Sequence, residues 1–139
     1  ARSYADILGY DLVIVDKKRE AANVAEVMNI IGDVEGKDVI LVDDMVDTAG
    51  TLVKAAEALK KKGATSVMAC CTHGVLSGPA YERIENGELD ELVISDTIPT
   101  RKNAKKITVL TASKMMGEAI RRIHNNESVN SIFDWLMLK

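Results

Sequence analysis

The segment VILVDDMVDTAGT, residues 39–51, constrains the fold of this chain more than any other feature. It opens with four consecutive aliphatic residues, which are typical of a strand buried on both faces of a parallel sheet. Acidic and small residues follow at once, and a helical pattern begins near Thr51. A strand, a small-residue loop and a helix N-terminus in this order present backbone N–H groups that bind phosphate. The segment therefore predicts an α/β fold with an anion-binding loop.

The acidic residues of this segment indicate what kind of ligand the loop binds. Asp43, Asp44 and Asp47 would repel a phosphate group, yet they lie beside the predicted phosphate-binding backbone. A ligand with two ends removes the conflict, because a diol needs acceptors such as Asp43 and Asp44 while a phosphate binds at residues 47–51. A sugar phosphate has both ends. The alternative interpretation is a solvated acidic loop without a ligand.

Strand and helix patterns alternate along the rest of the chain. Strands are predicted at residues 12–15, 27–31, 38–43, 66–71, 92–95 and 107–110, and helices at 3–8, 51–62, 77–86 and 113–124. This alternation is typical of a doubly wound, mostly parallel sheet with helices on both faces. Ligands of such folds bind beyond the carboxyl ends of the strands, and Asp43 lies at such an end.

Two of the predicted helices carry an apolar stripe, which we expect to face the sheet. In the helix at 51–62 the stripe consists of Leu52, Ala55, Ala56 and Leu59. In the helix at 113–124 it consists of Met116, Ala119, Ile120 and Ile123. Both helices are therefore expected to pack against the sheet.

Composition is that of a single globular α/β domain. The chain has 139 residues, 47% of them hydrophobic, which is enough for one sizeable core. The net charge of −3 gives no indication of a nucleic-acid surface, and no apolar run approaches the roughly 20 residues of a membrane span. Cys70 and Cys71 are neighbours in a predicted strand and point to opposite faces, which disfavours a mutual disulfide. Both are expected to be core residues in a reducing cytoplasm.

Two other phosphate-related motifs do not fit the spacing. Residues 32–37 superficially suggest a P-loop, but Asp38 occupies the Ser/Thr position and a strand follows in place of a helix. A phospho-accepting receiver domain would explain the acidic pair at residues 43–44 and Asp96. However, residues 97–106 are too few for the helix that such a domain requires before its next strand. The sugar-phosphate interpretation is therefore favoured.

Several segments together resemble one enzyme family. Residues 39–51 are similar to the phosphoribosyl-pyrophosphate loop shared by type I phosphoribosyltransferases and the ribose-phosphate pyrophosphokinases. Residues 16–20 and 23–32 resemble the catalytic flexible loop of the pyrophosphokinases and the strand after it. Residues 71–80 and 118–124 also match that family and not the transferases. The resemblance covers nearly the whole chain and implies the α/β fold of a type I phosphoribosyltransferase.

The resemblance implies a reaction, namely transfer of a pyrophosphoryl group from ATP to the anomeric hydroxyl of ribose 5-phosphate. The products would be AMP and phosphoribosyl pyrophosphate, a precursor for nucleotide biosynthesis. Attack at the β-phosphorus builds up negative charge, which Lys17 and Arg19 are expected to stabilise as the catalytic pair, together with Mg²⁺. The implied metal ligands lie upstream, so none is assigned in this chain. The residues implied to bind ribose 5-phosphate are Arg19, Asp43, Asp44, Asp47, Thr48, Ala49, Gly50 and Thr51.

The resemblance also bears on domain organisation and regulation. It implies that residues 1–139 form the C-terminal, phosphoribosyltransferase-like domain of a two-domain synthetase, whose N-terminal domain is absent from this chain. The enzyme is expected to be a cytoplasmic homo-oligomer, a hexamer by resemblance. The isolated chain is expected to be inactive and to expose apolar surface. Ser128 and Phe133 fall in a segment that resembles a phosphate- and ADP-responsive regulatory site, in which Asn130 replaces the usual serine.

Two other functions share this fold and stay open from the sequence. One is a non-catalytic regulatory subunit of such a synthetase, and the other is a type I phosphoribosyltransferase. The intact segments 16–19 and 43–51 favour an active enzyme over a regulatory subunit. Product analysis with ATP and ribose 5-phosphate separates the three.

Overall fold

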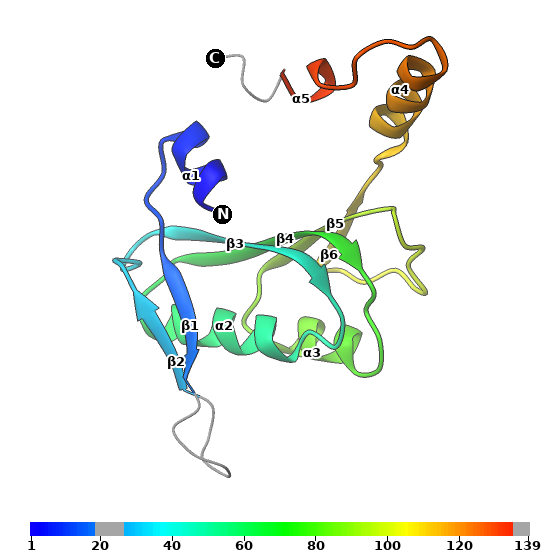
Figure 1. Ribbon diagram of the computed structural model, residues 1–139. Coiled ribbons are helices and arrows are strands. Elements are labelled where there is room, and N and C mark those ends of the chain that lie inside the picture. Colours follow the sequence, from blue (N-terminus) through cyan, green and yellow to red (C-terminus); the bar gives the residue numbers. More distant parts are fainter. Residues whose placement is uncertain (19–26, 135–139) are drawn as a thin grey trace.

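The computed structural model describes residues 1–18 and 27–134, with a parallel sheet at its centre (Figure 1). In chain order the elements are α1 (Arg2–Leu8), β1 (Ile14–Lys18), β2 (Val27–Ile31), β3 (Asp38–Val46), α2 (Gly50–Lys61), β4 (Ser66–Gly74), α3 (Ala80–Asn86), β5 (Glu91–Ser95), β6 (Ile107–Leu110), α4 (Ser113–His124) and α5 (Ser131–Asp134). Among these described helices, none has the length and apolar character needed to cross a lipid bilayer.

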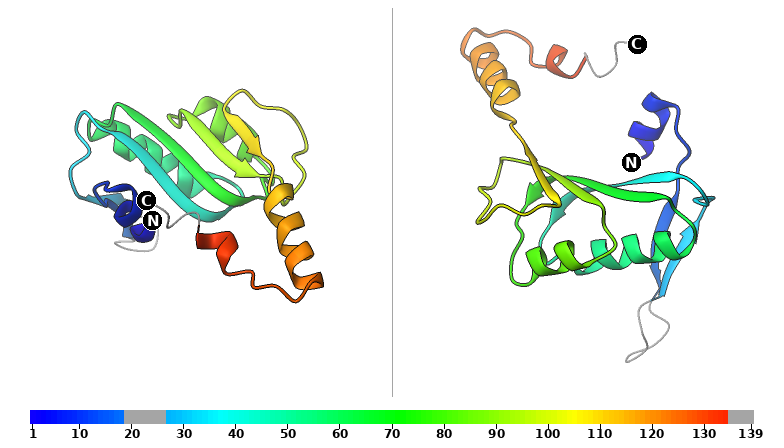
Figure 2. Two further views of the ribbon diagram at one scale, coloured as in Figure 1. Left: turned by 90° about the horizontal axis from the view of Figure 1, so that it is seen from above. Right: turned by 180° about the vertical axis from the view of Figure 1, so that it is seen from behind.

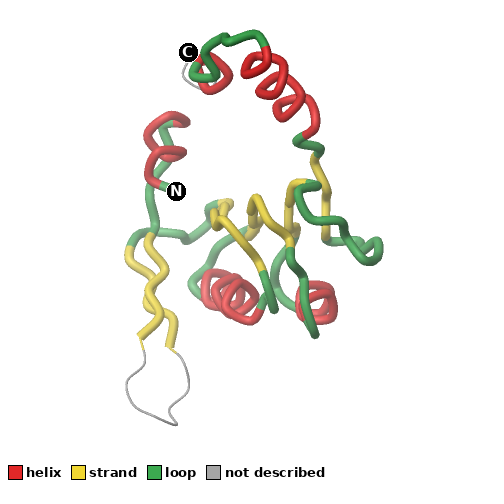
Figure 3. Tube along the Cα trace, turned by 45° about the vertical axis from the view of Figure 1, so that its right-hand side comes forward, coloured by secondary structure: helices red, strands yellow, loops and turns green. Residues whose placement is uncertain are grey.

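Four parallel strands form the main sheet in the order β3-β4-β5-β6. The pairing of β3 with β4 runs from Asp38 beside Ser66 to Val46 beside Gly74. Each strand of the sheet lies beside the strand that precedes it in the chain, so the chain crosses the sheet in one direction. Crossover connections between parallel strands are right-handed. The connecting helices α2 and α3 therefore lie on the same face of the sheet (Figures 1 and 3). β1 and β2 pair separately as an antiparallel ribbon. The prediction of an α/β fold built on a parallel sheet is confirmed.

The core lies between the sheet and the helices α2 and α3. Three residues of the predicted α2 stripe, Ala55, Ala56 and Leu59, are buried there, and Leu52 is half-buried. This prediction is confirmed, because a stripe at the helical period must face the apolar side of the sheet. The largest fully buried side chains are those of Val34, Leu59, Val67, Leu76, Ile84, Leu89, Leu92 and Ile94.

The opposite face of the sheet is largely uncovered. α1 lies on that side (Figure 1). An apolar cleft of about 740 Å³ is lined by residues of α1 and by residues of β3 and β4 such as Ile40 and Met68. The side chain of Ile40 is 54% exposed, and that of Tyr4 on α1 is also 54% exposed. The described chain therefore presents an apolar sheet face to solvent, as expected for a sheet with a second layer missing.

The two cysteines are free and lie on opposite faces of β4. Cys70 lines the open cleft, whereas Cys71 belongs to the core under the helices. Burial raises the pKa of the Cys71 thiol to about 11, so it is protonated at neutral pH. The prediction that both are core residues is confirmed for Cys71 and wrong for Cys70, which is half-buried on the uncovered face of the sheet.

α4 departs from the sequence prediction. After β6 the chain leaves the sheet and carries α4 and α5 away from it, so that no residue of α4 is buried (Figure 2). Met116, Ile120 and Ile123, predicted to face inward, are 54%, 68% and 66% exposed. Ala119 is half-buried. The prediction that this stripe packs on the sheet is wrong for the described structure, because a helical period reveals an apolar face but not the surface that covers it.

β3 and β4 continue beyond their predicted ends. The sequence predicts strand ends at Asp43 and Cys71, where polar residues follow, but the two strands stay paired as far as Val46 beside Gly74. Backbone hydrogen bonds between the strands, and burial of Val46 to 4% exposure, extend the pairing through polar positions. Asp43 and Asp44 are therefore strand residues and not loop residues.

Candidate functional site

The carboxyl end of β3 brings the predicted acceptor groups to one edge of the sheet. Asp43 lies beside Cys71 of β4, and both Asp43 and Asp44 are exposed. The Oδ1 atom of Asp43 accepts a hydrogen bond of 2.9 Å from the backbone N–H of Asp44. Both carboxylates are thus presented where ligands of parallel α/β sheets bind.

The turn from β3 into α2 has the geometry of an anion-binding loop. Ala49, the residue before α2, has a left-handed backbone (φ 57°, ψ 8°), which is uncommon for a non-glycine residue, and is 5% exposed. Among the described residues no side chain caps the helix start, and the Val53 N–H donates to the Ala49 carbonyl at 3.0 Å. The N–H groups of residues 50–52 have no acceptor within the helix, and the helix dipole makes this end electropositive. The exposed residues Thr48 and Thr51 flank it.

The segment between β4 and α3 contacts this loop. The Ser77 N–H donates to the Asp47 carbonyl at 3.1 Å, and the Ser77 hydroxyl donates to the Asp47 carboxylate. Nη1 of Arg83, on α3, donates to the Thr48 carbonyl at 2.9 Å. The loop is therefore held at two consecutive carbonyls by groups from another part of the chain.

The same segment also explains why α3 begins later than predicted. The sequence predicts a helix from Ser77, but Leu76 and Gly78 have positive φ values of 49° and 52°, which a right-handed helix does not contain. Pro79 caps the helix, which begins at Ala80. The non-helical backbone leaves the N–H of Ser77 available for Asp47.

Neighbouring strand ends add a second polar group to this edge of the sheet. His73 of β4 is half-buried, and its Nδ1 lies 2.9 Å from the hydroxyl of Thr97, which follows β5. The carboxylate of Asp96 accepts a hydrogen bond of 2.8 Å from the Ala112 N–H. This bond, and a weaker contribution from the Thr111 side chain, lower the pKa of Asp96. A polar edge extends from β3 to β6.

Of the predicted catalytic pair, Lys17 lies in β1, near the end of the β1–β2 ribbon. β1 spans Ile14–Lys18, further along the chain than predicted, because its antiparallel pairing with β2 includes Lys17 beside Met28. Lys17 therefore belongs to a strand and not to the loop that the sequence predicts. Arg19 lies outside the described residues. The catalytic assignment of Lys17 and Arg19 stays a prediction.

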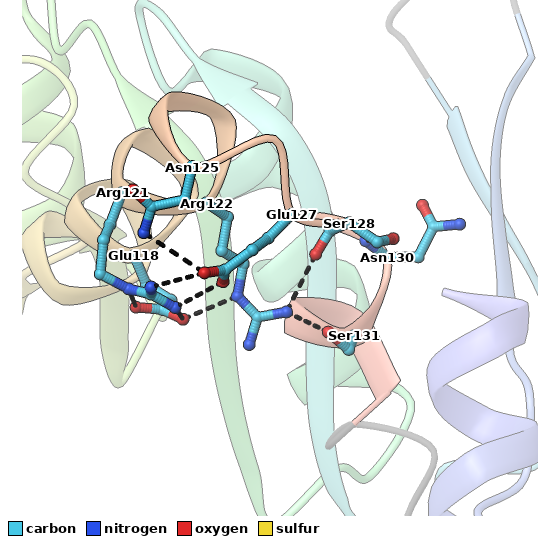
Figure 4. A network of polar contacts seen from close by, with 8 residues as sticks. All are labelled: Glu118, Arg121, Arg122, Asn125, Glu127, Ser128, Asn130 and Ser131. Carbon is cyan, nitrogen blue, oxygen red and sulfur yellow. Dashed lines mark hydrogen bonds and ion pairs between the residues drawn. The ribbon is translucent and has the colours of Figure 1, made fainter.

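The predicted regulatory segment is attached to α4 by charged groups (Figure 4). Glu118 accepts hydrogen bonds from Arg121 at 2.9 Å and from Arg122 at 2.6 Å. Arg122 also donates to the Ser128 carbonyl at 3.0 Å and to the Ser131 hydroxyl. The hydrogen bonds from the two arginines hold the pKa of Glu118 down at about 2. Through Arg122, α4 fixes the start of α5, although the regulatory role predicted for this segment is untested.

We expect Glu118→Gln to loosen the segment before Phe133, because Arg122 loses its charged partner. Amide deuterium uptake of residues 126–132 should rise about threefold or more, whereas Glu57→Gln, which removes a similar ion pair on α2, should leave it unchanged.

A carboxylate with a lowered pKa stabilises the fold above its unfolded pKa and loses this effect only as the pH falls through its folded pKa. With a folded pKa of about 2, uptake corrected for intrinsic exchange should be constant from about pH 5 to 8. A rise on going from pH 7 to 5 would contradict this.

Comparison with known proteins decides the family. A family profile described as the phosphoribosyl synthetase-associated domain matches residues 3–134. The chain belongs to the phosphoribosyl synthetase-associated domain family. This synthetase-associated domain is 68% identical over 133 residues to the ribose-phosphate pyrophosphokinase of Wolinella succinogenes, and 67% identical to that of Campylobacter jejuni subsp. jejuni. Each match covers 96% of the domain and 43% of the relative, so the chain spans less than half the length of these curated relatives.

A solved structure gives the same result for the fold of the synthetase-associated domain. The phosphoribosylpyrophosphate synthetase from Mycobacterium smegmatis matches it with a TM-score of 0.81 and 36% sequence identity. The match covers 90% of this chain and 41% of that one. The family resemblance and the fold predicted from the sequence are both confirmed.

The donor set of the synthetase-associated domain fits a magnesium ion that binds together with substrate. In the ranges that the structure describes, no group of three or more His, Cys, Asp or Glu side chains is arranged to hold a metal. Mg²⁺ usually keeps several waters and binds through one or two carboxylates plus substrate phosphates. The exposed oxygens of Asp43 and Asp44 supply carboxylates of this kind at the sheet edge.

Ser77 and Arg83 are the site residues of the synthetase-associated domain that sequence patterns do not reveal. Neither residue is near the loop in the sequence. Arg83 is 35 positions from Thr48, whose carbonyl it binds. The pairing of β3 with β4 brings Ser77 to the loop, and the packing of α3 beside the start of α2 brings Arg83 there (Figure 1).

Proposed function

We propose that this chain is the C-terminal, phosphoribosyltransferase-like domain of a two-domain ribose-phosphate pyrophosphokinase. The observation that carries the proposal is the junction of β3 and α2. There two exposed carboxylates, Asp43 and Asp44, precede a loop that leads into an uncapped helix N-terminus. The names of the relatives and the apolar open face of the sheet, suited to a second domain, support it.

The enzyme would transfer a pyrophosphoryl group from ATP to the anomeric hydroxyl of ribose 5-phosphate. Asp43 and Asp44 would accept hydrogen bonds from the ribose 2- and 3-hydroxyls, since ionised carboxylates are strong acceptors. The 5-phosphate would bind the N–H groups of residues 47–51, with the hydroxyls of Thr48 and Thr51 beside it. These two halves of the site match the two ends of a sugar phosphate.

Charge stabilisation at the β-phosphoryl group would come from the β1–β2 ribbon. Lys17 and Arg19 would donate to the oxygens on which negative charge develops in the transition state. Bound Mg²⁺ would neutralise phosphate charge and would be held mainly by substrate phosphates and waters, since no metal ligand is assigned in this chain. Ser128 and Phe133 would belong to a regulatory segment.

The whole synthetase would work on ATP and ribose 5-phosphate as a cytoplasmic homo-oligomer, a hexamer by family resemblance. Product analysis tests this. The full-length enzyme, given ATP, Mg²⁺ and ribose 5-phosphate, should release AMP and form phosphoribosyl pyrophosphate in equal amounts. Absence of AMP release from folded enzyme would overturn the assignment in favour of a non-catalytic subunit. Release of pyrophosphate from added phosphoribosyl pyrophosphate and a base would indicate a transferase.

Asp43→Asn and Thr51→Val should each weaken binding of ribose 5-phosphate about tenfold to a hundredfold in the full-length enzyme. Asp43→Asn replaces a charged acceptor by a neutral one, and Thr51→Val removes a donor to the charged phosphate; a hydrogen bond that involves a charged group is worth about 1.5–3 kcal/mol. Isothermal titration calorimetry measures the dissociation constant directly. The control is Asp38→Asn, at the opposite end of β3, where the side chain accepts a hydrogen bond from Ser66. Unchanged affinity in both site variants would remove Asp43 and Thr51 from the ligand site.

A further inference from the structure

We propose that Arg83 is a positioning residue for the phosphate loop, residues 47–51, and sets its affinity for the 5-phosphate of the substrate. The inference deepens the proposed function and rests on it. Arg83 lies on α3, in a part of the chain to which the sequence assigns no role. Its guanidinium is the side-chain group that holds the Thr48 carbonyl, at 2.9 Å.

Three consecutive carbonyls of the loop and the strand before it point toward the segment at 76–83. The Val46 carbonyl accepts a bond of 3.1 Å from the Leu76 N–H, and the Asp47 carbonyl accepts one of 3.1 Å from the Ser77 N–H. The Thr48 carbonyl is the third, and its donor is Arg83. The first two donors are backbone groups, whereas the third is a side chain that a single substitution removes.

This anchoring determines where the N–H groups of the loop point. The described residues contain no cis peptide bond. In a trans peptide the N–H points opposite to the carbonyl of the same unit. With the carbonyls of residues 46–48 turned toward α3, the N–H groups of residues 47–49 turn away from it. They are then directed to the side on which a phosphate can approach, as in other anion-binding backbone concavities.

Arg83 also brings a positive charge against the loop. A Cβ atom added to Gly50 would lie 3.2 Å from Nη1 of Arg83 and 3.8 Å from its Cζ. The guanidinium therefore lies close against the start of α2, and a side chain at position 50 would require it to shift by a few tenths of an ångström. Because the Thr48 carbonyl oxygen is paired with Arg83, it no longer repels a bound phosphate. The positive charge of the guanidinium also attracts the phosphate.

The test compares Arg83→Met with Arg83→Lys in the full-length enzyme. Arg83→Met should raise the dissociation constant for ribose 5-phosphate, measured by calorimetry, about tenfold. The KM for ATP should change less than about twofold and kcat less than about threefold, because the contact holds the sugar phosphate in ground and transition states alike. Arg83→Lys keeps a charged donor and should restore most of the affinity. Lys61→Met, at the far end of α2, controls for the loss of one positive charge and should have no effect.

A second variant tests the same contact from the other side. Gly50→Ala should shift the guanidinium slightly from the Thr48 carbonyl and weaken ribose 5-phosphate binding less than Arg83→Met does. In the double variant with Arg83→Met, the two effects should not add, because both act on the same contact. Additive effects would overturn the proposal.

Two further results would also overturn it. One is a dissociation constant for ribose 5-phosphate within about twofold of the wild type in Arg83→Met, whatever its melting temperature. The other is a loss of affinity in Arg83→Met that Arg83→Lys does not reduce, since a role in packing alone would not require the charge. A wild-type enzyme that binds ribose 5-phosphate but makes no phosphoribosyl pyrophosphate would contradict the proposed function and leave the calorimetric comparison valid.

Discussion

Replacement of Lys17 or Arg19 by alanine in the full-length synthetase is expected to lower kcat about a hundredfold or more. Negative charge develops on the β-phosphoryl oxygens in the transition state, so a cation positioned there contributes mainly to kcat. Removal of one such group raises the barrier by about 3 kcal/mol, which corresponds to roughly 150-fold in rate. The KM values for ATP and ribose 5-phosphate should change less than about threefold. Steady-state measurement of AMP release at saturating substrate gives both quantities.

Lys18→Ala is the matched control for this prediction. Lys18 lies between the two catalytic candidates in the sequence and carries the same charge as Lys17, but the family resemblance assigns it no catalytic role. Its replacement should lower kcat less than about threefold. A large loss in Lys18→Ala with normal turnover in Lys17→Ala would show that the alignment with the family is displaced by one residue.

Leu59→Ala is expected to have the largest effect on stability. Leu59 lies on α2, is 0% exposed, and belongs to the core between the helices and the sheet. Truncation of a buried leucine to alanine leaves a cavity and lowers the free energy of unfolding by about 2–5 kcal/mol. The melting temperature should fall by about 5 °C or more in a thermal scan of the full-length protein.

The volume-conserving variant Leu59→Met separates cavity formation from a general effect of substitution. It should lower stability by less than about 1.5 kcal/mol, since methionine fills nearly the same space. Equal losses of unfolding free energy in Leu59→Ala and Leu59→Met would contradict the prediction, because they would show that the cavity is not what destabilises the protein. Kinetic constants of the molecules that remain folded should be unchanged in both, because Leu59 lies far along α2 from the phosphate loop.

The family and the position of the loop could be read from the sequence because both depend on local patterns. A run of aliphatic residues followed by small residues and a helical period places a strand, a turn and a helix start wherever it occurs. The turn between β3 and α2 therefore lies at residues 47–49, close to where the pattern predicts it, and phosphate binding there stays a prediction. The stripe through Ala56 and Leu59 also packs as predicted, because the sheet it covers is built from the adjacent strands of the same chain.

Strand ends were less well predicted, since they depend on pairing partners. Asp43 and Asp44 look like loop residues from their polarity, but β4 stays paired with β3 to Val46 and keeps them in a strand. In the same way, β2 extends β1 to Lys18. Backbone hydrogen bonds between strands carry no side-chain signature, so their extent is decided when the strands meet.

The sequence by itself determined the α/β class, the family and the chemical character of the site, because residue type and spacing carry that information. Only the tertiary structure decided two further matters. It left the apolar stripe of α4 exposed, since amphipathicity identifies a face and not its partner. It also placed Arg83 against Thr48, a contact between residues 35 positions apart. Such a contact depends on how α3 packs beside α2, and packing is a property of the assembled layers and not of any local segment.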